Sequence, residues 1–442
     1  MGNGHVVIVG AGLGGLRAAE QLRAAGHSGP VTLLGAEAHL PYTRPPLSKE
    51  LLASTDSLTL AQAHEKVVFR RRASVADVTF RLGQPVIAAD LAGAALRLAD
   101  SAEVTFDGLV IATGLRPRRL PLPRATAVPA PLVLRTVDDS LALRAALTPG
   151  TRVAIIGGGF VGCEVAATAL ALGCEVTVIE VDQAPMLRVL GPELATAIQR
   201  SHEAAGIRFI TGHGVAAIEA APAVPGTATP DAATPDPAAP ATPDAAAGGV
   251  VLVSDGSHVP ADVIIEATGS LPNVEWLAGN GLDLSDGVLC GNDMAVASPE
   301  GADWQGRVVA VGDVARFPNP LFDAVPRRVE HWSMPTDTAR RAAATLHAAL
   351  TGTTLAGDAP FTPLPSFWTD QLDLRLWSYG SPVLGTEMAV TEGDLRRLSD
   401  GLIATYHRDG RHVGTVTVNI PPNLHRPLRE ALLTAALLKQ SP

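Results

Sequence analysis

Two stretches of the chain share one order of hydrophobic and polar positions. The first is His5–Glu37 (HVVIVGAGLGGLRAAEQLRAAGHSGPVTLLGAE) and the second is Arg152–Glu180 (RVAIIGGGFVGCEVAATALALGCEVTVIE). Each begins with an apolar, β-branched run, passes through a glycine cluster, continues as an Ala- and Leu-rich helical pattern and returns to a second apolar run. This order predicts a strand, a helix and a second strand parallel to the first. The repeat therefore predicts two related α/β domains.

The composition changes abruptly between residues 219 and 249. This stretch reads EAAPAVPGTATPDAATPDPAAPATPDAAAGG and contains no aromatic residue. Such a segment cannot bury enough apolar surface to offset the entropy of ordering it, so we expect a disordered insertion. The flanking sequences IRFITGHGVAAI and VVLVSDGSHVPADVIIEATG are typical of strands, which places the insertion at a hairpin tip. A partner-binding tail is the alternative.

Beyond Val325 no further glycine cluster of this kind occurs. The strand-like pieces LDLRLWSYG, LIATYH and HVGTVTVNI precede a helical pattern, HRPLREALLTAALLKQ. We expect a smaller α+β domain here.

Size and composition narrow the functional classes. A chain of 442 residues, 47% of them hydrophobic, predicts two or three domains. It has no apolar run of the ~20 residues that span a membrane, and its first residues lack the basic and apolar regions of a signal peptide. The three cysteines show no CxxC or metal-ligand spacing, so we expect neither disulfides nor a metal site, and a cytoplasmic location. A net charge of -10 argues against nucleic-acid binding.

Both glycine clusters fit the pattern G-x-G-x-x-G. The glycines are Gly10, Gly12 and Gly15 in the first cluster, and Gly157, Gly159 and Gly162 in the second. In this pattern the first glycine permits a tight turn, the second lets the backbone approach a pyrophosphate, and the third lets helix and strand pack closely. The start of the helix then faces the phosphates with its positive end. Two such sites predict two dinucleotides, and electron flow between a nicotinamide and a flavin is the simplest interpretation.

Several motifs, in order along nearly the whole chain, resemble those of one family. They are VVIVGAGLGGLRAAEQLR, PYTRPPLSKELL, DGLVIATGLRPRRLP, LRTVDDSLAL, VAIIGGGFVGCEVAATA, VVAVGDVARFPNPLFD, RRVEHWSMPTDTA and PSFWTDQLDL. They are similar to the flavoproteins with two dinucleotide-binding domains and, within these, to the NADH-dependent, putidaredoxin-reductase-like ferredoxin reductases that serve oxygenases and cytochromes P450. The resemblance implies an α/β fold with two Rossmann-like domains, as in glutathione reductase, plus a C-terminal α+β domain. It implies an FAD-binding domain over residues 1–117 and 271–325, an NAD(P)H-binding domain over 118–270 that carries the insertion, and a C-terminal domain over 326–442.

The resemblance also implies which residues bind the two cofactors. For FAD they are Gly10, Gly12, Leu13, Gly14, Gly15, Glu37, Arg44, Lys49, Val86, Ala112, Thr113, Gly114, Arg135, Gly312, Asp313, Glu330, His331 and Trp332. For NADH they are Gly157, Gly159, Phe160, Val161, Gly162, Glu164, Glu180, Arg188 and Gly269. Asp313 is expected to bond the ribityl chain, and Ala112–Gly114 to pass near the flavin phosphates.

The segment Pro41–Leu52 (PYTRPPLSKELL) lies where disulfide reductases of this superfamily carry a cysteine pair, and it has no cysteine. Electrons therefore cannot leave a reduced flavin by disulfide exchange and are expected to pass singly to an external acceptor. Its prolines restrict the backbone and would aim Lys49 at the flavin. The resemblance pairs Lys49 with Glu164, a pair that would balance charge during hydride transfer and orient the nicotinamide.

Coenzyme choice is expected to depend on Glu180, which ends the second strand of the second unit. An acid there accepts hydrogen bonds from the adenosine ribose and repels a 2′-phosphate, so NADH is favoured; Arg188 would weaken the discrimination. In the first unit the family usually has an acid directly after the strand-end glycine, but this chain has Ala36 there and Glu37 next. Either Glu37 reaches the FAD ribose or that contact is lost.

The stretch VEHWSMPTDTA departs from relatives, which usually have Asn-Ala where this chain has Met334 and Pro335. Proline suits the first turn of a helix, so we expect a helix to begin here and to direct its positive end at the flavin. Glu330, His331 and Trp332 would line the same flavin edge. We expect His331 to be a packed residue and not an acid or base.

The expected function is that of an oxidoreductase that moves a hydride from NADH to FAD and single electrons to a small iron–sulfur protein, a ferredoxin feeding a P450 or Rieske-type oxygenase. Arg340 and Trp368 match family positions at the docking surface, although Trp368 could equally be a core residue. The alternatives are an NADH oxidase or peroxidase, and a redox-sensing flavoprotein that acts as an interaction module.

Overall fold

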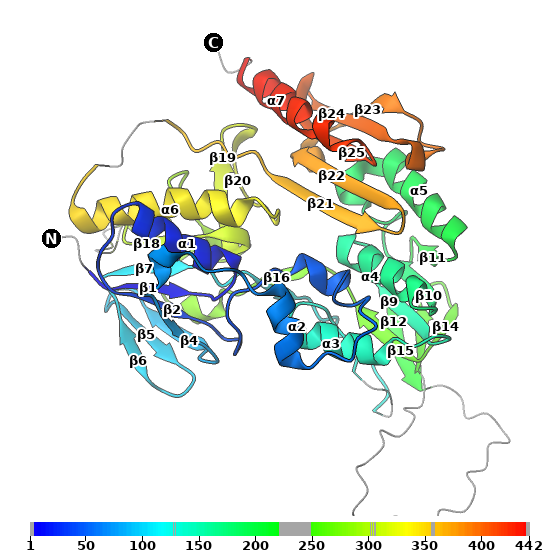
Figure 1. Ribbon diagram of the computed structural model, residues 1–442, viewed down its shortest axis with the longest axis horizontal. Coiled ribbons are helices and arrows are strands. Elements are labelled where there is room, and N and C mark those ends of the chain that lie inside the picture. The colour runs from blue at the N-terminus through cyan, green and yellow to red at the C-terminus, as the bar shows by residue number, and fades with distance from the viewer. Residues whose placement is uncertain are drawn as a thin grey trace, which may run out of the picture. The chain divides into compact units, whose positions relative to one another are not determined.

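The computed structural model describes residues 4–126, 128, 130–220, 249–300, 302, 304, 306–354 and 359–438 (Figure 1). The chain divides into two compact units. Unit 1 comprises Met1–Pro46, Leu58–Arg116 and Ser270–Pro442, and unit 2 comprises Leu47–Ser57 and Pro117–Gly269. The predicted three-domain boundaries stay a prediction.

The core of unit 1 is a parallel sheet built on the first predicted βαβ unit. Its strands, in spatial order, are β18 (Val308–Ala310), β7 (Gly108–Ile111), β1 (Val6–Val9), β2 (Val31–Leu34) and β3 (Thr79–Arg81). All four pairings are parallel, and every residue of β1, β7 and β18 is buried. Strands buried on both faces read as unbroken hydrophobic runs, which is why the sequence pattern identified this sheet.

Helices α1 (Leu13–Ala24) and α6 (Met334–Thr351) lie side by side on one face of this sheet (Figure 1). The helix predicted to begin at Met334 and Pro335 is confirmed, with Pro335 in its first turn. The hydrophobic core of the sheet continues into the antiparallel sheet of β4 (Val86–Asp90), β5 (Ala95–Leu98) and β6 (Glu103–Thr105).

Unit 2 repeats the arrangement of unit 1. Its parallel strands are, in spatial order, β11 (Arg208–Thr211), β10 (Glu175–Glu180), β9 (Arg152–Ile156) and β15 (Val263–Glu266). Its helices are α3 (Val137–Ala146), α4 (Phe160–Ala171) and α5 (Leu187–Ala205). Both predicted βαβ units are therefore confirmed, each with its first strand between its second strand and a strand from later in the chain.

A three-stranded antiparallel sheet completes unit 2. Its strands are β12 (Val215–Ala220), β13 (Gly249–Val253) and β14 (His258–Ala261). Ala220 pairs with Gly249, so the strands on either side of the predicted insertion form a hairpin. Most of that insertion, residues 221–248, lies outside the described residues.

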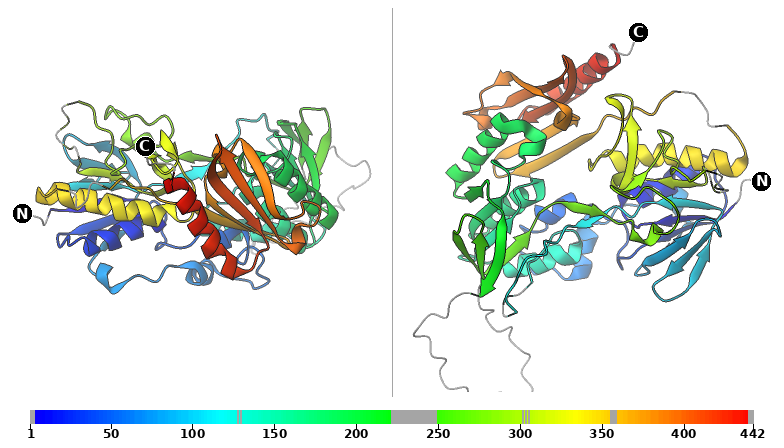
Figure 2. Two further views of the ribbon diagram at one scale, coloured as in Figure 1. Left: turned by 90° about the horizontal axis from the view of Figure 1, so that it is seen from above. Right: turned by 180° about the vertical axis from the view of Figure 1, so that it is seen from behind.

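The C-terminal part of unit 1 is an antiparallel sheet with one helix packed on it (Figure 2). The strands are, in spatial order, β21 (Ser366–Gln371), β22 (Leu374–Gly380), β25 (Arg411–Val418), β24 (Leu402–Arg408) and β23 (Glu387–Gly393), and the helix is α7 (Pro422–Leu438). This agrees with the strand and helix pattern predicted beyond Val325.

Shorter elements connect these layers. The strands are β8 (Leu115–Pro117), β16 (Ser270–Pro272), β17 (Val288–Leu289), β19 (Ala315–Asn319) and β20 (Asp323–Arg328), and the remaining α-helix is α2 (Leu60–Val67). The 3₁₀ turns are η1 (Pro45–Ser48), η2 (Ala73–Val75), η3 (Glu275–Leu277), η4 (Gly312–Val314), η5 (Pro382–Leu384) and η6 (Leu398–Asp400). None of the helices among the described residues is both long and apolar enough to cross a membrane.

Candidate functional site

The first glycine turn, in unit 1, is shaped by close backbone contacts. Gly10 has φ +118°, and a Cβ there would overlap the carbonyl of Ala112; a Cβ at Gly15 would overlap the carbonyl of Gly10. At Gly12, by contrast, a Cβ would meet nothing within 4 Å. Gly12 also precedes α1 without any side-chain cap. The turn thus leaves room beside the positive end of a helix, which is the arrangement that binds a phosphate.

The second turn, in unit 2, has the same construction. Gly157 has φ +108° and lies against the carbonyl of Ala267, while Gly162 lies against the carbonyl of Gly157. A Cβ at Gly159 would meet nothing within 4 Å, and α4 begins directly after it without a side-chain cap. Both turns therefore fit a dinucleotide pyrophosphate.

Three stretches predicted to bind FAD come together around the first turn. Gly10 lies against Ala112, as described above, and a Cβ at Gly14 would lie 3.3 Å from the side chain of Val311, the residue before Gly312. Gly312 in turn donates its N–H to Thr338 Oγ1 on α6 over 3.0 Å. Asp313 follows within η4.

Asn273 was not predicted from the sequence as a site residue. It holds Thr113 and Gly114, which follow β7. Its Nδ2 donates to the carbonyl of Thr113 over 3.0 Å, and Thr113 Oγ1 donates to the carbonyl of Asn273 over 2.7 Å. The N–H of Asn273 also donates to the carbonyl of Gly114 over 3.0 Å. A single asparagine in a loop gives no periodic signal, so only the paired contacts identify it.

Glu37 and Arg44, both predicted to contact FAD, form an ion pair. Arg44 Nη2 lies 2.6 Å from Glu37 Oε1, and the Tyr42 hydroxyl donates to Glu37 Oε2 over 2.5 Å. The Arg44 guanidinium also stacks 4.9 Å from the centre of the Tyr42 ring. Glu37 is therefore held by side chains of its own loop, and Ala36 beside it is exposed. Its contact with the FAD ribose stays a prediction.

The residues before α6 form an aromatic surface. Trp332 is 37% exposed and meets Trp368 edge-on at 5.4 Å between ring centroids, and Trp368 stacks on Trp377 at 5.6 Å. Trp368 is half-buried, so its exposure does not decide between a docking residue and a core residue. The neighbouring Glu330 accepts a hydrogen bond from the Ser270 hydroxyl over 2.9 Å.

His331 packs edge-on against Phe367, with 4.7 Å between the ring centroids. Burial lowers the pKa of His331 to about 4, so the imidazole is neutral near pH 7. The packing of this ring agrees with the expectation of a packed residue, and that His331 is not an acid or base stays a prediction.

In unit 2, Glu180 faces the second glycine turn. Glu180 is 9% exposed; its Oε2 accepts the N–H of Gly158 over 2.5 Å and its Oε1 accepts the N–H of Asp182 over 2.8 Å. Arg188 pairs with Asp182 at 2.8 Å. The carboxylate of Glu180 is therefore fixed on the turn by backbone groups.

Cys163, at the start of α4, is fully buried. Burial, reinforced by the nearby Glu180, raises the pKa of its thiol well above the usual range. A buried, protonated thiol is a poor nucleophile, so Cys163 is a packing residue.

Lys49 and Glu164, the predicted pair, lie in contact within unit 2. Lys49 Nζ is 2.6 Å from Glu164 Oε1, and both side chains are largely buried. Lys49 directly follows η1, and Glu164 lies in the first turns of α4. Their role beside a flavin stays a prediction.

The remaining predicted residues have the following positions. Leu13 begins α1, Val86 begins β4, Phe160 and Val161 begin α4, Arg135 precedes α3 in unit 2, and Gly269 accepts the N–H of Arg118 over 2.9 Å. None of these positions tests a cofactor contact.

Arg340, predicted to dock the partner, lies on α6 and its side chain is 66% exposed. It lines a pocket of about 360 Å³ together with Arg341, Arg429 from α7 and Asp337. Burial raises the pKa of Asp337, although Arg340 and Arg429 oppose the shift. Three arginines against one acid make this pocket suited to an anionic group.

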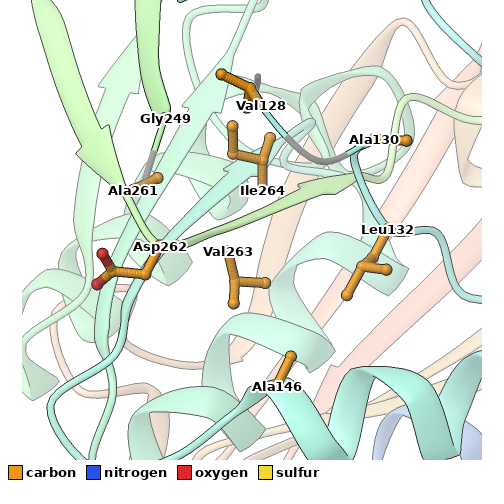
Figure 3. Close-up of a pocket in the computed structure, with 9 residues that line it drawn as sticks. All are labelled: Val128, Ala130, Leu132, Ala146, Gly249, Ala261, Asp262, Val263 and Ile264. Carbon is orange, nitrogen blue, oxygen red and sulfur yellow. The ribbon is translucent and has the colours of Figure 1, made fainter. Parts of the chain in front are cut away.

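A second cavity, of about 210 Å³, lies in unit 2 away from the glycine turn (Figure 3). Its lining is aliphatic apart from Asp262, whose carboxylate points away from the aliphatic side chains and pairs with Arg152. The side chains that line the cavity therefore present few groups that could bind or react with a polar ligand.

Comparisons with known proteins agree with this geometry. The family described as pyridine nucleotide-disulphide oxidoreductase matches residues 4–343. The chain is 34% identical to the ferredoxin–NAD(+) reductase component of the anthranilate 1,2-dioxygenase system of Burkholderia cepacia, over 94% of this chain and 90% of the relative. It is 32% identical to a probable ferredoxin reductase of Castellaniella defragrans, over 95% and 91% of the two chains.

A solved structure of the covalent putidaredoxin reductase–putidaredoxin complex matches with a TM-score of 0.80 and 28% identity, over 98% of this chain and 94% of that chain. The match confirms the predicted α/β fold with two Rossmann-like domains. The chain belongs to the pyridine nucleotide-disulphide oxidoreductase family.

Proposed function

We propose that the protein is an NADH:ferredoxin reductase that binds FAD at the first glycine turn and NADH at the second. The observation that carries the proposal is the Lys49–Glu164 pair, whose lysine lies in the segment where disulfide reductases carry cysteines. The relatives named as ferredoxin reductases, one of them from a dioxygenase system, support the same acceptor. The structure of a putidaredoxin reductase with putidaredoxin supports a small iron–sulfur partner feeding an oxygenase or P450.

The chain's own groups supply binding, orientation and charge. FAD, when bound, supplies the ability to take up a hydride and release single electrons. The two uncapped helix starts hold the pyrophosphates, and Glu180 selects NADH by accepting hydrogen bonds from its ribose. Lys49 brings a positive charge, balanced by Glu164, to the place where negative charge develops during hydride transfer.

An NADH oxidase or peroxidase is the weaker alternative, because the chain lacks the residue that this reaction needs. An NADH peroxidase normally needs a reactive cysteine at the flavin, and Pro41–Leu52 has none, while Cys163 is buried. Cys163, Cys174 and Cys290 are all free and buried, which is consistent with a cytoplasmic location; that location is part of the proposal. A redox-sensing module remains the other candidate and would show slow reduction by NADH.

The test is a two-part assay. The purified protein should contain non-covalent FAD, be reduced rapidly by NADH without oxygen, and reduce cytochrome c only when a ferredoxin is added. FMN in place of FAD, or full cytochrome c reduction without ferredoxin, would contradict the proposal.

We further propose that an acidic ferredoxin docks at Arg340 and Trp368. Arg340→Glu should leave flavin reduction by NADH unchanged and lower ferredoxin-dependent turnover by about tenfold at low salt, because one exposed attractive charge becomes repulsive. Arg97→Glu, the same charge change on β5, is the matched control and should have little effect. Turnover should also fall as salt rises, since exposed charges are screened over about 10 Å at 0.1 M. Wild-type turnover of Arg340→Glu at low salt would place docking elsewhere, and the three consecutive exposed arginines Arg70–Arg72 would be tested next.

A further inference from the structure

Ser48 occupies a special place beside the Lys49–Glu164 pair. Its hydroxyl donates to Glu164 Oε2 over 2.5 Å, whereas Lys49 Nζ meets the other oxygen, Oε1, at 2.6 Å. The two oxygens of one carboxylate are thus held by two consecutive residues. A carboxylate bonded at both oxygens cannot rotate without breaking one of the bonds, so Ser48 limits where Glu164 can present its charge to Lys49.

Ser48 is itself held by the helix that carries Glu164. Thr168, one turn further along α4, donates its hydroxyl to the carbonyl of Ser48 over 2.7 Å. Residues four apart lie on one face of a helix, so Glu164 and Thr168 together bracket Ser48. All three residues are less than 10% exposed. Buried hydrogen bonds to a charged group are among the stronger ones, because water cannot replace them.

Other contacts anchor the same segment without touching the carboxylate. The Ser140 hydroxyl, on α3, donates to the carbonyl of Leu47 over 2.8 Å, and Arg144 Nε donates to the carbonyl of Ser54 over 2.7 Å. Ser140 is as deeply buried as Ser48. The segment Leu47–Ser57 therefore has a second buried serine hydroxyl bond, from Ser140, that does not reach Glu164.

We propose that Ser48 is a positioning residue for hydride transfer, acting through Glu164 and held in place by Thr168. The inference rests on the proposed function, since it assigns a role within NADH-dependent flavin reduction. The Ser48 hydroxyl donates a hydrogen bond to Glu164 and thereby fixes the carboxylate that orients Lys49. Its hydroxyl neither donates nor accepts a proton in the reaction.

The test is stopped-flow reduction of the FAD-containing protein by NADH without oxygen. Ser48→Ala should lower the limiting rate of flavin reduction by about tenfold, with a smaller change in the apparent Kd for NADH, because misorientation acts on the reacting geometry more than on binding. Ser140→Ala, which removes a buried hydroxyl anchor of the same segment, is the matched control and should keep the wild-type rate. Thr168→Val should give an intermediate loss, and Ser48→Thr, which keeps a hydroxyl, should recover most of the rate.

The decisive measurement is a double-mutant cycle with Glu164→Gln. If Ser48 acts through the carboxylate, Ser48→Ala should change the rate little in the Glu164→Gln background. An equal loss in both backgrounds, an equal loss in Ser140→Ala, or a wild-type rate in Ser48→Ala would each overturn the inference. Failure of the wild-type protein to be reduced by NADH would instead overturn the proposed function. If Ser48→Ala does not fold with FAD, the same cycle run with Thr168→Val decides.

Discussion

In unit 1, Val9 at the end of β1 lies opposite Leu34 at the end of β2, and Leu34 is followed by Gly35. In unit 2, Ile156 at the end of β9 lies opposite Ile179, and the next residue is Glu180. The same backbone hydrogen bond closes both turns, from Gly10 to Leu34 and from Gly157 to Ile179, each over 2.8 Å. The two positions are therefore equivalent, and one holds a glycine where the other holds an acid.

The neighbouring residues are exchanged in a matching way. In unit 1 a side chain at Gly35 would collide with Ala11, whereas in unit 2 the residue equivalent to Ala11 is Gly158, which makes room for Glu180. The acid of unit 2 is thus placed by the register of a parallel sheet. The acid of unit 1, Glu37, comes two residues later and is placed by the side chains of its own loop. The acid expected at the ribose is therefore held by a strand in unit 2 and by a loop in unit 1.

The largest effects are expected from substitutions that place a negative charge in each glycine turn separately. Gly12→Asp and Gly159→Asp each add a carboxylate in open space, so both variants should fold. Gly12→Asp should lose FAD during purification, because a negative charge beside the pyrophosphate weakens binding by about 100-fold or more. Gly159→Asp should keep its FAD and raise the KM for NADH by a similar factor. Flavin content and steady-state kinetics measure the two effects; loss of FAD in Gly159→Asp would reverse the assignment of the turns.

A smaller effect is expected at the acid of unit 2. Glu180→Ala should narrow the preference for NADH over NADPH by roughly one to two powers of ten, since one contact to a charged group is lost. The ratio of kcat/KM for the two coenzymes measures it. Glu37→Ala is the control, because it removes the acid of the other unit and should leave this ratio unchanged. An unchanged ratio in Glu180→Ala would remove Glu180 from the coenzyme site.

The smallest effect is expected at the acid of unit 1. Glu37→Ala should weaken FAD binding by about tenfold, because the ribose would lose the acceptor expected for it and Arg44 would lose its carboxylate partner. Ala36→Glu, in an exposed position, should bind FAD at least as tightly as the wild-type protein. Titration of the FAD-free protein measures both. Wild-type affinity in Glu37→Ala would show that the ribose contact is absent from this chain.

Much of the fold could be predicted because its signals are local. Buried strands give unbroken apolar runs, and glycines forced by backbone contact at Gly10 and Gly157 mark the turns. The start of α6 followed from Pro335 alone. The sequence pattern predicted β15 as a strand within VVLVSDGSHVPADVIIEATG, whereas β18, which joins its sheet from far along the chain, came from the resemblance and not from local periodicity.

The site was predicted less completely, because its supporting contacts join residues far apart in sequence. Ser48 and Thr168 are separated by 120 positions, and Asn273 lies 160 positions from Thr113. Nothing in the local pattern distinguishes such serines, threonines and asparagines from those of an ordinary loop. Glu37 lies one residue past the position where the motif places the acid, and its contacts show that matching a motif by position can miss how an acid is held.

The assignment of Leu47–Ser57 to unit 2 has a consequence for protein engineering. The segment lies in the chain between two stretches of unit 1, yet Ser140, Arg144, Glu164 and Thr168 all bind it. A chimera that exchanges only Pro117–Gly269 for the matching stretch of a relative would leave Lys49 with one parent and Glu164 with the other. Such an exchange should include Leu47–Ser57 as well, so that Lys49 and Glu164 come from the same parent protein.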